Sequence, residues 1–179
     1  MATAPRGFFV TLEGVDGAGK STQAARLAAH LRTRGIGVVE TREPGGSEGA
    51  EAIRALLLGG EAGRWSATTE MLLFTAARRD HVERTIAPAL AEGRAVVCDR
   101  YVDSTRAYQG AGDPHAAAEV DVLHARMIGL DPHLTVLLDL DPAEAALRRA
   151  GDGADRFEAR GLAFQVRLAA HFRAIAAAE

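Results

Sequence analysis

The sequence predicts an α/β fold built on a doubly wound parallel sheet. Short apolar segments of strand length alternate along the chain with longer segments that have helical periodicity. Polar residues directly follow three of the predicted strands. Because this alternation is typical of parallel sheets covered by helices on both faces, we expect those polar residues to meet at the carboxyl edge of one sheet.

The first half of the chain begins with the apolar segment Phe8–Leu12, which a glycine-rich stretch separates from a helical pattern. A turn at Gly35 to Gly37 then leads into a second, short strand. Pro88 is expected to kink or end the long helix that contains it. The predicted elements here are strands 8–12 and 38–41 and helices 21–33, 50–58 and 68–91.

The second half opens with Ala95–Asp99, whose continuous apolar run predicts a strand buried on both faces. Asp141 and Pro142 have the residue types of an N-cap and a first helical position. The remaining predicted elements are helix 116–128, strand 134–140, helix 142–150 and helix 162–178. Neither repeats nor a linker interrupt this order, so residues 1–179 are expected to form a single domain.

The bulk composition is that of a soluble globular chain, with nearly half of its residues apolar. The net charge of −3 argues against nucleic acid as a partner, and the apolar runs are too short to cross a membrane. The N-terminal segment MATAPRG lacks the apolar region of a secretory signal, so a cytoplasmic location is expected. A single cysteine, Cys98, cannot form a disulfide within the chain and is expected to be a small buried residue.

The only lysine of the chain, Lys20, lies in a pattern that binds phosphate. Gly14 is followed by four residues and then by Gly19, Lys20 and Ser21. Glycines allow backbone N–H groups to surround phosphate oxygens, while the ammonium group reaches the outer phosphates and the serine hydroxyl can contact Mg²⁺. A glycine-rich turn with an incidental lysine is the alternative. The pattern predicts a P-loop NTPase-type sheet and an ATP site formed by Gly14, Val15, Asp16, Gly17, Ala18, Gly19, Lys20, Ser21 and Thr22.

Several arginines follow or flank the predicted strand ends, namely Arg42, Arg54, Arg78 and Arg100. A guanidinium group binds phosphate oxygens in a bidentate manner, so this set predicts a second phosphorylated ligand. For a lone arginine a surface salt bridge is the simpler interpretation. We apply it to Arg79 and Arg84.

Six segments together give the chain a resemblance to thymidylate kinases. They are GVDGAGKST at 14–22, TREPGG at 41–46, IRALLL at 53–58, LLFTAARRDH at 72–81, VVCDRYVDSTRAYQG at 96–110 and HLTVLLDLDPAEA at 133–145. The resemblance implies transfer of the γ-phosphate of ATP to dTMP, with Mg²⁺ as cofactor. It also implies a homodimer formed through the helices around Asp80 and Ala116–Ile128.

The resemblance further implies a role for each matching residue. Asp16 resembles the carboxylate that accepts the 3′-hydroxyl of deoxyribose and helps to organise the metal, and Arg54 and Arg100 resemble the clamp on the acceptor phosphate. Asp99 lies at the end of a predicted strand, where its carboxylate can hold Mg²⁺ directly or through water, together with the Ser21 hydroxyl of the phosphate loop. The other residues that the resemblance places around dTMP are Glu43, Phe74 as the ring stacked on thymine, Arg78 at the base edge, Ser104, Thr105, Tyr108 against the 2′ position, and Gln109.

A short lid is expected near residues 148–156. Some members of the family carry an arginine in the phosphate loop at the position of Gly17, and glycine cannot supply that charge. We therefore expect a lid arginine to cover the transferred phosphate, and favour Arg149 and Arg156 over Arg148. Family members continue beyond the last helix with a further strand, so the C-terminal edge strand is expected to be missing here.

Two other functions stay open at the level of sequence. One is a related nucleoside monophosphate or nucleoside kinase with another base preference, although the arginines favour an acceptor that is already phosphorylated. The other is a non-catalytic nucleotide-binding relative, which the combination of Asp16, Lys20, Ser21 and Asp99 argues against.

Overall fold

The computed structural model describes residues 7–61, 63–111, 114–148 and 161–178. Its strands are β1 (Phe9–Glu13), β2 (Val38–Arg42), β3 (Ala95–Asp99) and β4 (Leu134–Leu137). Its helices are α1 (Lys20–Thr33), α2 (Glu48–Leu58), α3 (Ala67–His81), α4 (Ala87–Ala91), α5 (Val102–Gly110), α6 (Pro114–Leu123), α7 (Pro142–Arg148) and α8 (Gly161–Ala178). Two π-helical turns, η1 (Val82–Ile86) and η2 (His124–Ile128), continue α3 and α6.

The four strands form one parallel sheet in the order β2-β3-β1-β4, which confirms the predicted fold class. β1 is central and pairs with β3 on one side and β4 on the other, with Thr11 opposite both Cys98 and Thr135. No strand of the described residues lies beyond β4, so β2 and β4 are the two edges. The carboxyl ends of β1, β2 and β3 therefore lie next to one another.

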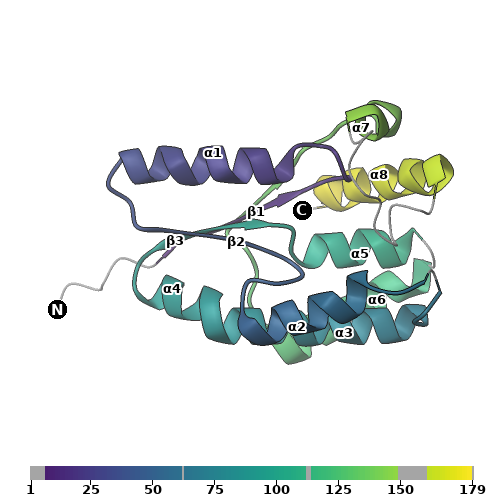
Figure 1. Cartoon of the computed structure of the whole chain (residues 1–179), viewed down its shortest axis with the longest axis horizontal. Helices are drawn as coiled ribbons and strands as arrows, with labels where there is room; N and C mark the ends of the chain where they lie inside the picture. The colour runs from purple at the N-terminus through teal and green to yellow at the C-terminus, as the bar shows by residue number, and fades with distance from the viewer. Residues whose placement is uncertain (1–6, 62, 112–113, 149–160, 179) are drawn as a thin grey trace.

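Apolar side chains on both faces of the sheet form the core, as the strand patterns require. On one face Val10, Leu12 and Val97 pack against α1 through Ala24 and Ala28. On the opposite face the core combines Phe9, Met71, Val82, Ile86, Ala89, Val96, Cys98, Tyr101, Val102 and Val120. Figure 1 shows α1 on one side of the sheet, with α2, α3, α4 and α6 on the other. The sheet is thus covered on both faces.

A third apolar cluster joins α5, α7 and α8 beside the phosphate loop. Phe164, Leu168 and Phe172 of α8 pack against Val15 and Ala107, and Ala145 of α7 closes the cluster. This packing places the last helix next to the loop that follows β1. Among the described residues, no helix is long and apolar enough to span a membrane.

Helix α5 is the largest difference from the predicted elements, which contained no helix between β3 and residue 116. Its sequence, VDSTRAYQG, is polar and has no capping side chain at Tyr101. The helix is instead held by tertiary contacts, because it packs against α6 and α8 and the N–H of its N-cap residue, Tyr101, donates to buried Glu13. Local propensity alone could not predict it.

Smaller differences concern the long helix and the fourth strand. The predicted helix 68–91 is continuous but passes through the π-helical turn η1 before Pro88. A wider turn fits the proline, which has no N–H and a ring that would clash with the preceding turn of an α-helix. β4 ends at Leu137 rather than at residue 140. The capping prediction for α7 is confirmed, since Asp141 Oδ1 accepts hydrogen bonds from the N–H groups of Ala143 and Glu144.

Candidate active site

A cavity of about 500 Å³ lies at the carboxyl ends of β1, β2 and β3. The phosphate loop lines one side, α2 and α3 line another, and the β3–α5 connection lies between them. The cavity therefore brings together most of the residues singled out in the sequence. Those that line it are Asp16, Gly17, Gly19, Lys20, Ser21, Thr22, Arg42, Glu43, Arg54, Phe74, Arg78, Asp99, Arg100, Ser104, Thr105, Tyr108 and Arg148.

Glycine is required at two positions of the phosphate loop. Gly14 has a φ of +137°, and a Cβ added there would lie 2.6 Å from the carbonyl oxygen of Leu138. Gly19 has a φ of +92° at the N-cap position of α1, and it has no side chain to occupy the N–H groups of the first turn. These N–H groups and the positive end of the helix dipole are therefore available to phosphate oxygens.

Lys20 is buried in the curve of this loop. Its ammonium group donates to the Val15 carbonyl oxygen at 2.8 Å and lies 3.9 Å from an oxygen of Asp16. Burial lowers the pKa of Lys20 to about 7, and the nearby Arg100 guanidinium acts in the same direction. A phosphate in the loop would favour the charged form, so the lysine is placed to respond to an anion.

Arg100 contacts the phosphate loop from the end of β3. It directly follows β3 and has a positive φ (+73°), which is uncommon for a residue other than glycine. Its guanidinium donates to Ser104 Oγ at 3.0 Å and to the Gly14 carbonyl at 3.3 Å, and it forms an ion pair with Asp16. Burial acts to lower the pKa of Arg100, but Asp16, Tyr108, Glu13 and Asp99 together outweigh burial and raise it. The Tyr108 hydroxyl donates to the other oxygen of Asp16 at 2.6 Å.

Glu13 lies directly beneath this group, and the sequence interpretation assigned it no role. Its carboxylate is fully buried and accepts hydrogen bonds from the Tyr101 N–H at 2.7 Å and from Ser104 Oγ at 2.6 Å. Burial, reinforced by the carboxylate of Asp103, raises its pKa to about 7. Glu13 thus ties the end of β1 to the first turn of α5, directly after Arg100.

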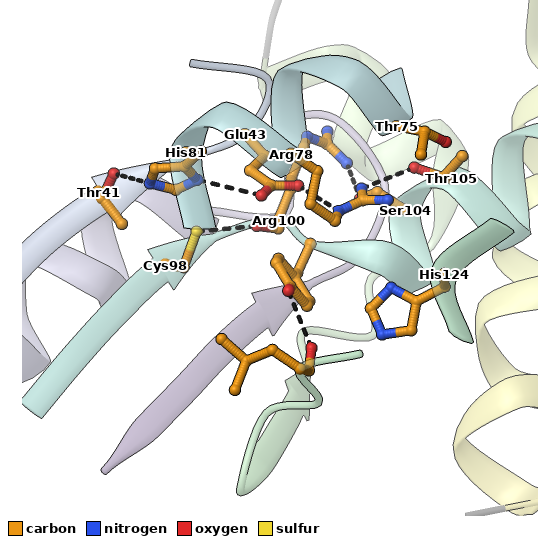
Figure 2. Close-up of polar contacts among 12 residues, drawn as sticks. Thr41, Glu43, Thr75, Arg78, His81, Cys98, Arg100, Ser104, Thr105 and His124 are labelled. Carbon is orange, nitrogen blue, oxygen red and sulfur yellow. Dashed lines mark hydrogen bonds and ion pairs between the residues drawn. The ribbon is translucent and has the colours of Figure 1, made fainter. Parts of the chain in front are cut away.

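On the far side of the cavity a buried ion pair joins Glu43 and Arg78. Arg78 Nε donates to Glu43 at 2.7 Å, and another guanidinium nitrogen donates to Thr105 Oγ1 at 2.9 Å. Figure 2 shows this pair continuing through His81 to Thr41. His81 is buried and has two polar partners in this chain of contacts.

The side chains that could hold Mg²⁺ lie between the phosphate loop and β3. Ser21 Oγ donates to Asp99 Oδ2 at 2.5 Å, and Asp99 Oδ1 is buried without a hydrogen-bond partner in the described part of the chain. An oxygen of this kind suits a hard divalent cation. The described residues contain no cluster of three or more His, Cys, Asp or Glu side chains that could bind a metal. Phosphate oxygens and water molecules would complete the coordination of a Mg²⁺ ion held there.

Other predicted residues differ in how directly they face the cavity. Arg54 lines it and donates to the Pro44 carbonyl at 2.6 Å, and Phe74 lines it from α3. Gln109 is buried but is not a lining residue, and Gly14, Val15 and Ala18 do not line the cavity either. The favoured lid residues Arg149 and Arg156 lie outside the described residues.

Two arginines that were assigned to the surface are on the surface. Arg79 pairs with Glu83 and donates to the Met127 carbonyl, with its side chain half exposed. Arg84 lies 3.9 Å from Asp80, and its side chain is 75% exposed. Neither lines the cavity.

Comparison with known proteins agrees with this geometry. The family model described as "Thymidylate kinase" matches residues 12–179. A thymidylate kinase of Jannaschia sp. (strain CCS1) is 60% identical over 171 residues, which are 94% of this chain and 82% of the relative. One from Ruegeria pomeroyi is 58% identical over 168 residues, covering 93% of this chain and 80% of the relative.

The fold is also that of a solved thymidylate kinase. The crystal structure of thymidylate kinase from Ehrlichia chaffeensis superposes with a TM-score of 0.77 at 36% sequence identity, covering 96% of this chain and 87% of that one. The phosphate loop, the arginine-lined cavity and these similarities over nearly the whole length lead to one conclusion. The chain belongs to the thymidylate kinase family.

Proposed function

We propose that this protein transfers the γ-phosphate of ATP to dTMP, giving dTDP, with Mg²⁺ as cofactor. The observation that carries the proposal is that Lys20 and Arg100 line the same cavity and both contact the Asp16 carboxylate. Lys20 lies in the phosphate loop, where the donor ATP would bind. Arg100 lies at the end of β3, beside a second set of polar residues. Family membership supports the same reaction.

ATP is bound by the loop of residues 14–22. The backbone N–H groups and Lys20 surround its β- and γ-phosphates, and the first turn of α1 adds its dipole. Ser21, Asp99 and Asp16 are the residues that would hold Mg²⁺, which when bound would neutralise charge on the phosphate oxygens. The proposed donor site thus uses the loop and the end of β3 together.

The acceptor occupies the other side of the cavity. Arg54 and Arg100 bind its phosphate, Phe74 stacks on thymine, and Arg78 reaches the base edge. Asp16 accepts the 3′-hydroxyl of the sugar. Tyr108, held by Asp16, lies against the 2′ position and excludes a ribose hydroxyl. The remaining proposed contacts with dTMP are Glu43, Ser104, Thr105 and Gln109.

The reaction needs little covalent chemistry from the protein. An acceptor phosphate oxygen displaces ADP in line, and charge spreads over the transferred group. Lys20 and Arg100 bring two anions together and compensate their repulsion, which in a largely buried site is worth more than in water. A lid arginine, Arg149 or Arg156, completes this compensation. Arg148, which lines the cavity, would adjoin them.

We further propose a homodimer formed through α3, α6 and η2. Large apolar side chains are exposed on these elements, with Leu72 at 52%, Val122 at 53% and Met127 at 49% exposure. A face of this kind is typical of a protein interface. The cytoplasm, where ATP and deoxynucleotides are made and used, is the proposed location, and neither nucleic acid nor a membrane is a proposed partner.

The decisive experiment measures phosphoryl transfer from Mg·ATP by this chain to dTMP, dUMP, UMP and AMP side by side. A strong preference for dTMP supports the proposal. dUMP lacks only the thymine methyl group, so it should be a poorer acceptor by about 1–3 kcal/mol in transition-state binding. Preference for AMP or UMP would assign the chain to another monophosphate kinase activity. Binding of dTMP without transfer to any acceptor would leave only a nucleotide-binding role.

A further inference from the structure

A continuous chain of polar contacts runs from β2 through the protein interior to α5. Thr41 Oγ1 lies 2.7 Å from His81 Nε2, and His81 Nδ1 lies 3.1 Å from Glu43 Oε1. The second oxygen of Glu43 accepts from Arg78 Nε at 2.7 Å, and Arg78 in turn donates to Thr105 at 2.9 Å. Figure 2 shows the imidazole of His81 between Thr41 and Glu43, on the side away from Thr105.

These contacts are shielded from water. The side chains of His81 and Arg78 are 0% and 3% exposed, and that of Glu43 is 5% exposed. The backbone at Gly46 lies close to the His81 ring, because a Cβ added to Gly46 would lie 2.3 Å from both His81 Nε2 and Thr41 Oγ1. Gly46 also has a φ of +86°, so two independent reasons favour glycine there. The ring has little freedom to leave its position.

The partners determine the direction of the hydrogen bonds. A carboxylate only accepts, so His81 Nδ1–H donates to Glu43. In the neutral form of the ring Nε2 carries no proton and can accept from the Thr41 hydroxyl. In this arrangement the buried group contains one negative charge on Glu43 and one positive charge on Arg78, which balance each other.

Glu43 needs two donors to stay in place. Without the His81 bond, one oxygen of the buried Glu43 carboxylate loses its donor. The Glu43 side chain is then free to adopt another rotamer, in which it no longer accepts from Arg78. Arg78 would then be held by Thr105 and by the ring of Tyr101, whose centroid lies 5.0 Å from the guanidinium carbon. The orientation of the Arg78 fork in the cavity would be less well defined.

We propose that His81 is a positioning residue for base recognition, which orients Arg78 through Glu43 and is itself oriented by Thr41. The inference rests on the proposed function, in which Arg78 reaches the base edge of dTMP. His81 touches neither substrate nor reacting atoms in this proposal. Its effect is therefore expected in acceptor binding and base discrimination rather than in ATP binding or in the transfer step.

The test compares KM for dTMP, KM for ATP and kcat in the full chain, together with kcat/KM for dTMP relative to dCMP. His81→Leu removes both hydrogen bonds, and we expect KM for dTMP to rise about tenfold with a matching loss of discrimination. His81→Asn keeps an N–H close to the Nδ1 position and should recover most of both. KM for ATP should stay within about twofold of the wild type.

Threonine variants keep the proposal testable if His81→Leu does not fold. Thr41→Val removes the hydroxyl that orients the ring, while Thr41→Ser retains it, so only the valine variant should lose discrimination. Thr85→Val is the matched control, because the Thr85 hydroxyl donates to the Gly46 carbonyl at 2.7 Å without touching this chain of contacts. Equal discrimination in Thr41→Val and Thr85→Val would overturn the proposal.

Arg78→Met distinguishes the assignment of Arg78 to the base edge from the positioning role of His81. If Arg78→Met weakens dTMP and discrimination while folded His81→Leu changes neither, the role of His81 is overturned and the proposed acceptor site stands. If Arg78→Met itself leaves dTMP recognition unchanged, the assignment of Arg78 to the base edge is overturned, and the role of His81 is overturned with it.

Discussion

Replacing Glu13 by glutamine should make the unfolding free energy less dependent on pH. Glu13 is fully buried, and its pKa is about 7 rather than the ordinary 4.5. The folded state therefore binds a proton more tightly than the unfolded chain does. The resulting stability is fully present below about pH 4.5 and is lost as pH rises through about 7.

The size of the effect follows from the two pKa values. A carboxyl whose pKa moves from 4.5 to about 7 on folding carries about 3 kcal/mol of pH-dependent stability. Roughly 2 to 3 kcal/mol of this is lost between about pH 5 and about pH 8. Glutamine has a similar volume and can still accept from the Tyr101 N–H, but it cannot ionise. The variant should thus gain stability relative to the wild type as pH rises.

Urea unfolding followed by circular dichroism, at several pH values between about 5 and 8, measures this difference. Glu92→Gln is the matched control, because the Glu92 side chain is 63% exposed and its loss should give a difference that hardly varies with pH. A difference between the wild type and Glu13→Gln that is constant over this range would refute the reasoning. A difference that grows with pH in favour of the wild type would refute it as well.

Arg100→Ala should lower kcat/KM for dTMP by about 100-fold or more. Arg84→Ala, which changes a 75% exposed side chain, should keep kcat/KM within about twofold of the wild type. Equal losses in the two variants would contradict the assignment of Arg100 to the acceptor phosphate. Tyr108→Ala should raise turnover of UMP relative to dTMP, and an unchanged ratio in the same assay would remove its role at the 2′ position. Asp99→Asn should raise the Mg²⁺ concentration for half-maximal activity about tenfold or more, which a magnesium titration at saturating ATP measures; an unchanged midpoint would exclude Asp99 from the metal site.

The strands and the phosphate loop could be predicted because their determinants are local. Phe9 to Leu12 is an apolar run broken only by Thr11, and the glycines before Lys20 have a fixed spacing, so neither depends on distant residues. The resemblance in the segment around Arg100 placed that residue beside the loop, where it contacts Asp16. Its left-handed backbone gave no signal in the sequence.

Glu13 and His81 could not be predicted in the same way, because their partners lie far along the chain. Glu13 bonds Ser104, 91 residues away, and His81 bonds Glu43, 38 residues away. A glutamate at the end of a strand and a histidine at the end of a helix are individually unremarkable. Their roles arise from burial, which only the folded arrangement determines. Helix α5 was missed for the same reason, since contacts with α6 and α8 stabilise a polar segment.

The ion pair between Arg100 and Asp16 has a consequence for how an acceptor reaches the cavity. A phosphate that approaches this guanidinium meets a cation that already has a carboxylate partner. When dTMP enters, its phosphate would replace the Asp16 carboxylate as the partner of Arg100. The Asp16 carboxylate would in turn accept a hydrogen bond from the sugar hydroxyl of dTMP. A free phosphate ion brings no such hydroxyl, so an Asp16 carboxylate that it displaced would gain no new donor beyond its contacts with Tyr108 and Lys20. Asp16 would in this way act as a gate that favours a whole nucleotide over the inorganic phosphate abundant around it.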